Sequence, residues 1–224
     1  GRVYVGGQST FGYLEADASG TVGYVPLSDR LPDTTRTFTD VWDVAALGDD
    51  VYFRTAAFLF RWTGDSLHTT PLRETTYFMR RARDRLFVSS VQRGLLEIRG
   101  DAIHPVPGFD LSGDLDYLCP VVVPLGEDRL LLVTYLDGAY VWQDGRLTRF
   151  ETEADDLLRA LRPYTGTLLP DGRIAVGTLR GGLIVLEPDG RIAFHLHEGN
   201  GLPSTTVSRL YVDREGALWA LLEV

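Results

Sequence analysis

The histidines are the residues of this chain best suited to metal binding or acid–base chemistry. His195 and His197 lie two positions apart, so on a strand both side chains would point to one face, a spacing that can chelate a metal ion. No third or fourth ligand is spaced with them. His68 and His104 stand at matching positions of two sequence repeats, which favours packing over catalysis. We therefore expect neither a metal site nor a cofactor.

Cysteine and carboxylate chemistry receives little support from the sequence. Cys119 is the one cysteine and lies in an apolar run, where a buried thiol behaves as a small hydrophobe. Adjacent acids such as Asp49 and Asp50, or Asp155 and Asp156, point different ways and make a poor general acid–base pair. The sequence has no Ser-His-Asp order and no phosphate-binding glycine loop. We predict no catalytic residue here and do not expect an enzyme.

The elements that would position any site follow a repeat. Three segments read alike and begin 44 residues apart, and a fixed period of about 40–45 residues is typical of repeat architectures. Each copy carries a glycine at the same place, and these glycines are Gly94, Gly138 and Gly182. The copies are Arg85–Ile98, Arg129–Trp142 and Arg173–Leu186.

One copy can be divided into four short strands. Asp171-Gly172 and Asp189-Gly190 are tight-turn pairs between apolar runs, because glycine tolerates a positive φ. β-branched and aromatic residues fill the runs between these turns, as expected of strands. The predicted strands are Tyr164–Leu169, Ile174–Leu179, Leu183–Leu186 and Ile192–Leu196.

The repeat predicts an all-β fold, a β-propeller of four-stranded antiparallel blades with a repeat of about 44 residues. About five blades are covered, as part of a larger propeller array, and the phase starts and stops inside a blade, which favours a segment of a longer protein. A short helix over Glu153–Leu161 is expected between two blades, with acids at its start. The predicted blades span approximately 1–32, 33–73, 74–112, 113–154, 155–204 and, in part, 205–224.

Charge and hydropathy exclude several partners. The formal net charge is −9 and all 22 basic residues are Arg, so a nucleic-acid backbone would be repelled. No apolar run approaches the roughly 20 residues of a membrane-spanning helix. No signal peptide is recognisable at the start of the sequence. We expect neither nucleic-acid binding nor a membrane span in this segment.

The C-terminal stretch Glu198–Ala220 resembles the two-component regulator propeller repeat, a phrase close to NGLPSNxVxxLxxDxxGxLWxGT. The stretch departs from this phrase before Val207 and after Trp219, where the second Asn and the usual Gly-Thr are absent. The resemblance is close over about a quarter of the chain and loose elsewhere. The matching positions are Asn200-Gly-Leu-Pro-Ser, Val207, Leu210, Asp213, Gly216, Leu218 and Trp219.

The resemblance implies a sensor domain of hybrid histidine kinase-like regulators, on the periplasmic or extracellular side of the inner membrane as part of a membrane protein. It implies glycan-fragment recognition and signalling to a kinase or DNA-binding output outside this chain. The expected partners are an oligosaccharide and, through the full-length protein, a second copy. Alternatives are a propeller glycosidase or lyase, of which a glycosidase would need two opposed carboxylates, and a non-enzymatic interaction or dimerisation scaffold.

A ligand of such a sensor should contact the loops of one propeller face, where the connections between second and third strands and between blades gather. Aromatic rings there could stack on a sugar while polar side chains donate hydrogen bonds. Trp62, Trp142 and Trp219 are instead expected to fill gaps between blades. The candidate ligand-binding residues are Gln8, Ser9, Phe11, Arg36, Gln92, Arg93, Tyr135, Asp137, Arg180 and Asn200.

Overall fold

A computed structural model describes residues 2–223, and within them the strands form six sheets. Four of these sheets have four strands each, in the order in which the strands occur in the chain. Chain-neighbouring strands therefore pair with one another, as in the blades of a propeller. The all-β prediction is confirmed. The chain is divided into two compact units. Unit 1 comprises the residues up to 88 together with 97–104, and unit 2 comprises 89–96 together with the residues from 105 onward.

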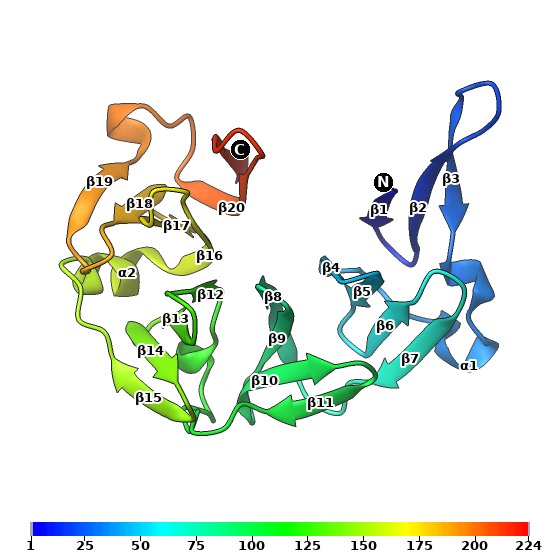
Figure 1. Ribbon diagram of the computed structural model, residues 1–224, viewed down its shortest axis with the longest axis horizontal. Coiled ribbons are helices and arrows are strands. Elements are labelled where there is room, and N and C mark those ends of the chain that lie inside the picture. The colour runs from blue at the N-terminus through cyan, green and yellow to red at the C-terminus, as the bar shows by residue number, and fades with distance from the viewer. Residues whose placement is uncertain (1, 224) are drawn as a thin grey trace. The chain divides into compact units, whose positions relative to one another are not determined.

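Unit 1 contains two complete sheets (Figure 1). Phe11 packs at the centre of its core, with ring centroids 4.5 Å from Phe53 and 4.8 Å from Phe60. A 3-10 helix, η1 (Ser28–Arg30), and a short helix, α1 (Asp33–Arg36), connect the two sheets. The strands are β1 (Val3–Gly6), β2 (Phe11–Ala16) and β3 (Val22–Pro26) in one sheet, and β4 (Asp43–Leu47), β5 (Asp50–Arg54), β6 (Phe58–Trp62) and β7 (Leu67–Pro71) in the other.

A third sheet has residues that belong to unit 1 and residues that belong to unit 2. Its residues alternate little between buried and exposed along the second and third strands, which are buried over most of their length. Such strands have packed neighbours on both faces. The sheet comprises β8 (Thr76–Ala82), β9 (Arg85–Ser90), β10 (Gly94–Arg99) and β11 (Ala102–Pro105).

Unit 2 contains two four-stranded sheets and a two-stranded one, with first strands β12, β16 and β20 side by side in that order (Figure 1). The 3-10 helices are η2 (Leu115–Tyr117) and η3 (Glu198–Asn200). The strands are β12 (Val121–Pro124), β13 (Arg129–Val133), β14 (Ala139–Gln143) and β15 (Arg146–Arg149); β16 (Pro163–Leu168), β17 (Ile174–Thr178), β18 (Leu183–Leu186) and β19 (Ile192–Leu196); and β20 (Thr206–Val212) and β21 (Leu218–Glu223).

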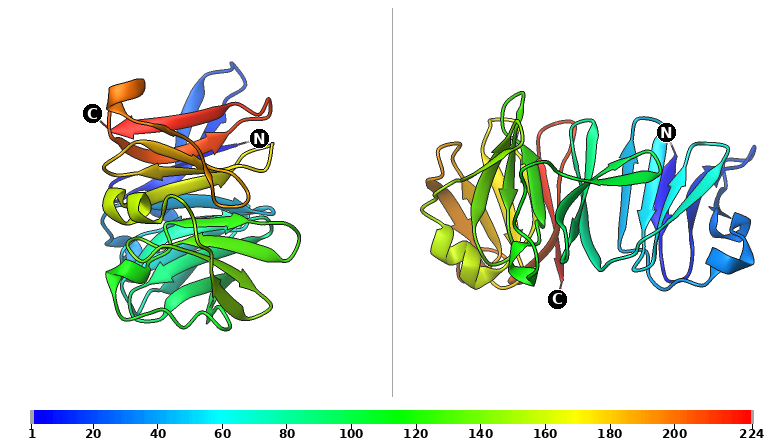
Figure 2. Two further views of the ribbon diagram at one scale, coloured as in Figure 1. Left: turned by 90° about the vertical axis from the view of Figure 1, so that its left-hand side faces the viewer. Right: turned by 90° about the horizontal axis from the view of Figure 1, so that it is seen from below.

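The helix α2 (Asp155–Leu161) connects β15 to β16 and confirms the predicted helix, two residues shorter at its start. Leu158 on this helix is 1% exposed and belongs to the apolar cluster formed by β12, β13, β17 and β18. Figure 2 shows α2 and η2 at the same end of the strands of unit 2. The helix thus covers one end of the core, and its last residues lie among the loops there.

The recurring glycines are explained by their backbone conformation. Gly94, Gly138 and Gly182 all have φ between 71° and 128°, a region that side chains with a Cβ atom rarely adopt. A Cβ on Gly182 would also lie 2.2 Å from the carbonyl oxygen of Leu196. The repeat therefore preserves a sharp turn between the second and third strand of each sheet.

Most side chains predicted to pack in the core do so. Cys119 is buried, and this burial raises the pKa of its thiol above the ordinary value. Trp62 and Trp142 are likewise buried near the ends of third strands. The prediction for Trp219 is wrong, because its side chain is 63% exposed. It lies on β21, which pairs with β20 alone among the described strands, and its indole N–H donates to the Asp213 carboxylate at 2.7 Å.

Candidate functional site

The candidate site of unit 2 is a rim of loops at one end of its sheets, built from residues 91–93, 113–118, 134–138, 161–162, 179–182 and 198–206. Backbone hydrogen bonds join each turn between second and third strands to a connection that leads into a first strand. Gly113 N donates to Val91 O at 2.7 Å, and Leu136 N donates to Asp116 O at 3.1 Å. These bonds bring loops distant in sequence together at one end of the strands, as the prediction required.

The next part of this rim pairs the end of α2 with the turn after β17. Leu179 N donates to Arg162 O at 3.0 Å, and Arg180 N donates to Leu161 O at 3.1 Å. A Cβ on Gly181 would lie 2.3 Å from the Leu161 side chain, so this turn approaches the helix end as closely as a glycine permits. Arg162 and Arg180 are thereby held on two adjoining backbone segments.

Arg162 also lies on the rim, although it is not among the ligand-binding residues predicted from the sequence. It caps α2 with φ 60° and ψ 89°, a conformation that favours glycine. Its guanidinium carbon lies 5.5 Å from the centroid of the Tyr135 ring, and Nη1 donates to the Tyr135 hydroxyl at 3.4 Å. The sequence signal available was an Arg, rather than a Gly or Asn, between the predicted helix and Pro163.

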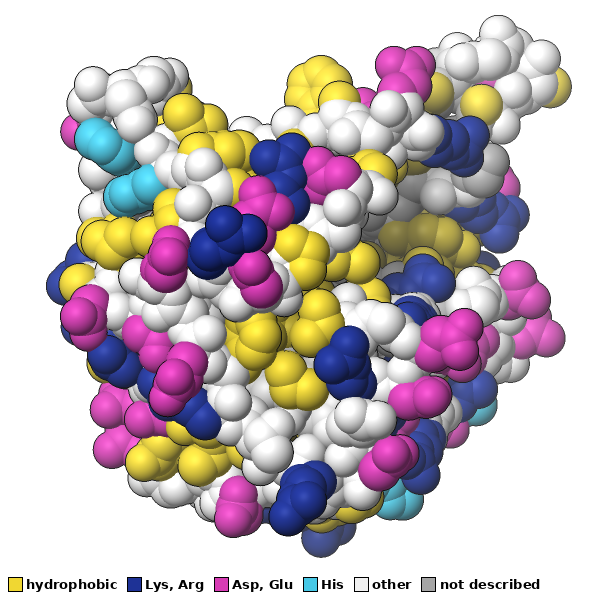
Figure 3. Space-filling view, turned by 60° about the vertical axis from the view of Figure 1, so that its left-hand side comes forward, with side chains coloured by type: hydrophobic (Ala, Val, Ile, Leu, Met, Phe, Trp, Pro, Cys, Tyr) yellow, Lys and Arg dark blue, Asp and Glu magenta, His cyan; other side chains and the backbone are white. Residues whose placement is uncertain are grey.

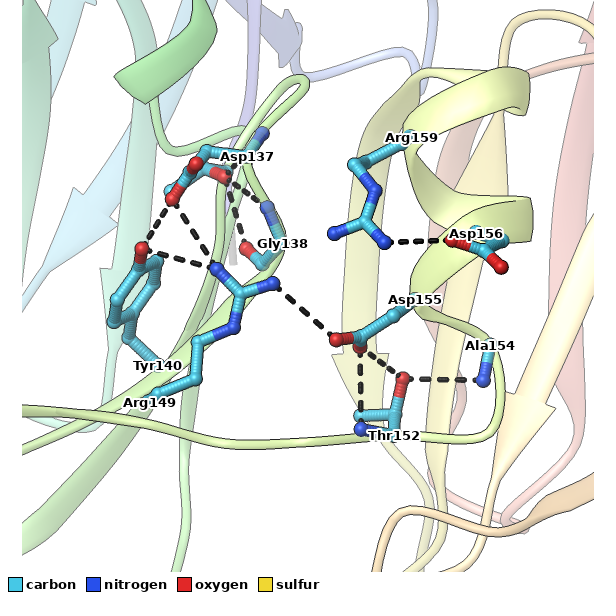
Figure 4. A network of polar contacts seen from close by, with 10 residues as sticks. Asp137, Gly138, Tyr140, Arg149, Thr152, Ala154, Asp155, Asp156 and Arg159 are labelled. Carbon is cyan, nitrogen blue, oxygen red and sulfur yellow. Dashed lines mark hydrogen bonds and ion pairs between the residues drawn. The ribbon is translucent and has the colours of Figure 1, made fainter.

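Asp137 belongs to a polar network that joins the turn after β13 to the start of α2 (Figure 4). Tyr140 donates its hydroxyl proton to the Asp137 carboxylate, and Arg149 donates to the same carboxylate at 3.3 Å and to Asp155 at 3.2 Å. Asp155 in turn accepts from the backbone N–H and the hydroxyl of Thr152. Asp137 is therefore engaged within the protein.

This network also changes the chemistry of Tyr140. Burial raises the pKa of its hydroxyl above the ordinary value, and the hydrogen bond to Asp137 raises it further, outweighing the opposing effect of Arg149. The tyrosine thus stays protonated and donates to Asp137. A Cβ on Gly138 would lie 2.3 Å from the Arg149 guanidinium, so this glycine makes room for the arginine that holds the network together.

Asn200 serves the chain itself through both ends of its amide. Its Oδ1 accepts from the N–H of His197 at 2.6 Å, and its Nδ2 donates to the carbonyl of His195 at 2.8 Å. These bonds cap η3, and His197 completes the cap by accepting from Gly199 N. The structure thus gives Asn200 the turn role rather than a free amide for a ligand.

The two predicted strand histidines lie next to each other, with ring centroids 5.0 Å apart. Figure 3 shows two histidine side chains next to each other on the surface, and acidic and basic side chains interspersed elsewhere on the same face. His195 Nε2 is hydrogen-bonded to Gly181 O at 2.6 Å, and His197 Nδ1 accepts from Gly199. Within residues 2–223 no group of three His, Cys, Asp or Glu side chains is arranged to hold a metal ion.

Three further candidates of unit 2 lie on exposed parts of the rim. Gln92 and Arg93 occupy the turn between β9 and β10, where Gln92 accepts from the Ser90 hydroxyl at 3.4 Å. Arg180 is exposed in the corresponding turn between β17 and β18. On the rim of unit 2, Arg162 therefore contacts Tyr135 and is joined through its backbone to the turn of Arg180, whereas Asp137 and Asn200 form hydrogen bonds within the chain.

The four candidates of unit 1 have other surroundings. Phe11 is fully buried in the aromatic core, so its ring is unavailable for stacking on a sugar. The prediction that Phe11 stacks on a ligand is therefore wrong. The sequence pattern places Phe11 on a loop, whereas in the structure it is the first residue of β2. Gln8 forms an isolated bridge with Asp40, Ser9 donates its hydroxyl to Phe38 O at 3.0 Å, and Arg36 donates to Leu31 O at 2.9 Å.

Unit 1 also contains a buried charge cluster that the sequence did not indicate. The Asp43 carboxylate accepts from Arg54 at 2.6 Å and from Arg80 at 3.2 Å, and it also accepts from Met79 N. Burial alone would raise the pKa of Asp43, but the two guanidinium groups outweigh it and hold this pKa below the ordinary value. The cluster ties β4, β5 and β8 together as a structural feature.

No protein-family model matches the chain, and no curated protein sequence matches it either. The resemblance of Glu198–Ala220 to the regulator repeat therefore stays a prediction. No helix within residues 2–223 has both the length and the apolar character needed to cross a membrane.

Solved structures match well at low sequence identity. Virginiamycin B lyase from Staphylococcus aureus has a TM-score of 0.68 at 14% identity, with 95% of this chain and 70% of the lyase covered. The extracellular domain of a protein assigned to the hybrid two-component systems of B. thetaiotaomicron has a TM-score of 0.70 at 18% identity, with 98% of this chain covered. The WD40 β-propeller domain of Doa1 has a TM-score of 0.66 at 12% identity, with 97% of this chain and 70% of that chain covered.

This chain spans 30% of the extracellular domain that it matches. Its neighbours include a lyase, an extracellular domain of a two-component system and a WD40 domain, so the likeness establishes the fold and not a shared activity. The repeat of sheets within the chain and the likeness to these structures give the same result, and the chain is a β-propeller.

Proposed function

We propose that this propeller is the extracytoplasmic ligand-sensing part of a membrane-bound two-component regulator and recognises glycan fragments. The observation that carries the proposal is the rim of unit 2, where Tyr135 lies beside Arg162 and the backbone of Arg162 is hydrogen-bonded to the turn that carries Arg180. Aromatic rings beside hydrogen-bond donors suit a sugar, whose ring faces are apolar and whose edges carry hydroxyl groups.

Two further findings support this function. The stretch Glu198–Ala220 resembles the repeat of such regulators, and the fold is similar to an extracellular domain of a hybrid two-component system. The kinase or DNA-binding output lies outside this chain in the proposed protein. Binding at the rim would act on that output through the remainder of the protein, which requires that the ligand be bound and released unchanged.

A lyase is the second candidate, because the fold is also similar to virginiamycin B lyase. The carboxylate chemistry of an enzyme would have to come from residues such as Asp213, which lies in the turn between β20 and β21. Its carboxylate accepts from Trp219 Nε1 at 2.7 Å and from the N–H groups of Glu215 and Ala217. The hydrogen bond from Trp219, followed by that from Ala217, lowers the pKa of Asp213 below its ordinary value. This geometry holds a turn and leaves the sensing function as the better-supported candidate.

Calorimetric titration of the chain with a panel of neutral and acidic oligosaccharides tests the proposal, with mass spectrometry of each ligand afterwards. We expect saturable binding by at least one glycan, recovered with unchanged mass. Tyr135→Ala should weaken that binding about 3- to 10-fold, because the ring supplies stacking area. Tyr211→Ala is the matched control, since Tyr211 is an exposed tyrosine outside the rim.

Recovery of a ligand with altered mass would favour the lyase instead. Failure of every glycan to bind, or equal loss of binding in the two tyrosine variants, would contradict the proposed glycan site. These outcomes differ in the mass of the ligand and in the pattern of the variants, so each candidate function can be rejected separately.

A further inference from the structure

The unpaired cations of the unit 2 rim indicate which glycans would bind. Arg149 and Arg159 near this rim are neutralised by carboxylates, at 3.2 Å from Asp155 and 2.6 Å from Asp156. Arg162 and Arg180 form no ion pair with any carboxylate of residues 2–223. In a chain of net charge −9, two guanidinium groups that lack counter-charges and are carried by hydrogen-bonded backbone segments make a local positive site.

The neighbouring carboxylates do not neutralise this site. Asp137 is held by Tyr140 and Arg149 (Figure 4). Asp116 lies on η2, where its carbonyl oxygen accepts from Leu136 N, and its carboxylate makes no ion pair with either Arg162 or Arg180 among the described residues. The charges of Arg162 and Arg180 therefore remain for an anionic group supplied from solution.

The backbone at Arg162 adds a second argument. A non-glycine residue at φ 60° is strained by roughly 1 kcal/mol, and glycine is the residue usually found at such a helix end. An arginine at this position lowers the stability of the chain relative to glycine, which indicates that its side chain serves another purpose. Half-burial beside Tyr135 holds the guanidinium in one place, which prepares it for a planar two-oxygen partner such as a carboxylate.

We propose that the rim of unit 2 binds a carboxylate-bearing saccharide, a uronic acid, through Arg162 and Arg180, with the Tyr135 ring beside the sugar. This inference rests on the proposed glycan-sensing function and specifies the chemical class of the ligand. Arginine pairs with a carboxylate through two parallel hydrogen bonds, and a ring beside the same guanidinium offers an apolar surface to the sugar face.

A purely structural role for Arg162 is the competing explanation, because cations also favour the C-terminal end of a helix. Replacement by glycine separates the two. Arg162→Gly relieves the positive φ, so the variant should be as stable as the parent chain or more stable. If the guanidinium binds a ligand, the same variant loses that binding despite its stability.

The experiment compares trigalacturonic acid with its methyl ester, which keeps the sugar and removes the charge. Calorimetric titration of the full chain should show binding of the acid, at least tenfold weaker binding of the ester, and weakening of acid binding by added salt. Arg162→Gly and Arg180→Ala should each weaken binding of the acid about tenfold or more, because each removes a charge-assisted contact.

Arg83→Gly is the matched control. Arg83 also has a positive φ, 57°, and lies in the turn between β8 and β9, among the residues of unit 1 and not among those of the rim. This variant should keep full affinity for the acid. Thermal unfolding of all variants verifies that each is folded when it is titrated.

Equal affinity for acid and ester, full affinity in Arg162→Gly, or no binding of either probe would overturn the uronate proposal. Binding of a neutral glycan that Tyr135→Ala weakens would at the same time preserve the proposed sensing function. Equal competition by citrate would identify a general anion site and would also overturn the saccharide assignment.

Discussion

At the residue scale, the buried charges of Asp43, Arg54 and Arg80 show how much one side chain can contribute. Asp43 is 9% exposed and accepts hydrogen bonds from both guanidinium groups. Because removal of one member leaves buried charges uncompensated, Asp43→Asn should lower the free energy of unfolding by about 3–5 kcal/mol. Asp189→Asn breaks an exposed pair with Arg191 and should change the stability little, because solvent screens that pair. Denaturant unfolding of both variants measures the difference, and equal costs would contradict this account.

The same residue sets a pH dependence. The folded-state pKa of Asp43 lies below its ordinary value, so its contribution to stability is present above the ordinary carboxyl pKa of about 3.9 and is lost as the pH falls below it. Stability of the parent chain should therefore fall between about pH 5 and pH 2 more steeply than that of Asp43→Asn. Parallel acid-unfolding curves for the two proteins would show that Asp43 is not the group responsible.

Individual residues show which parts of the candidate site could be predicted from the sequence. Tyr135 and Arg180 were placed on the correct loops because glycines at fixed spacing locate the turns that carry them. Arg162 was missed, because its importance comes from a backbone angle and a ring contact that arise only after α2 packs on the sheets. Phe11 was misassigned, since one residue of shift at a strand start moves a side chain between loop and core.

At the scale of elements, α2 determines where Arg162 and Asp155 lie. Leu158 is 1% exposed within the apolar cluster of unit 2, whereas Arg159 beside it is exposed. Leu158→Ala should cost about 2–4 kcal/mol, since it leaves a cavity beneath the helix, and Arg159→Ala should cost less than about 0.5 kcal/mol. Thermal unfolding distinguishes them. Similar melting temperatures for the two variants would contradict the docking of α2 on this core.

The strands of β16–β19 agree with their predicted ranges to within one residue, because Asp-Gly turns and glycines with positive φ punctuate them. The helix α2 was predicted from its leucine spacing and its leading acids. Trp219 shows the limit of this reasoning. Its sequence position resembles that of buried residues in other repeats, but exposure depends on which sheet lies against β21, and no local pattern encodes that neighbour.

At the scale of the whole molecule, the repeat establishes the fold and leaves the function to the loops. Propellers with unrelated activities match this chain at 12–18% identity, because packed sheets conserve apolar patterns rather than particular residues. The net charge of −9 with all basic residues as Arg makes the unit 2 rim a local exception in an acidic protein. Function must therefore be tested at the loops.

Hydrogen–deuterium exchange of the chain, with and without trigalacturonic acid, tests the central claim most directly. The account predicts slower exchange in residues 134–138, 161–162 and 179–182 when the saccharide is present, with the exchange of β20 and β21 unchanged and the saccharide intact afterwards. Exchange in these loops that is unaffected by the acid and by every other glycan of the panel, or slowed only outside them, would contradict the assignment of the unit 2 rim as the sensing site.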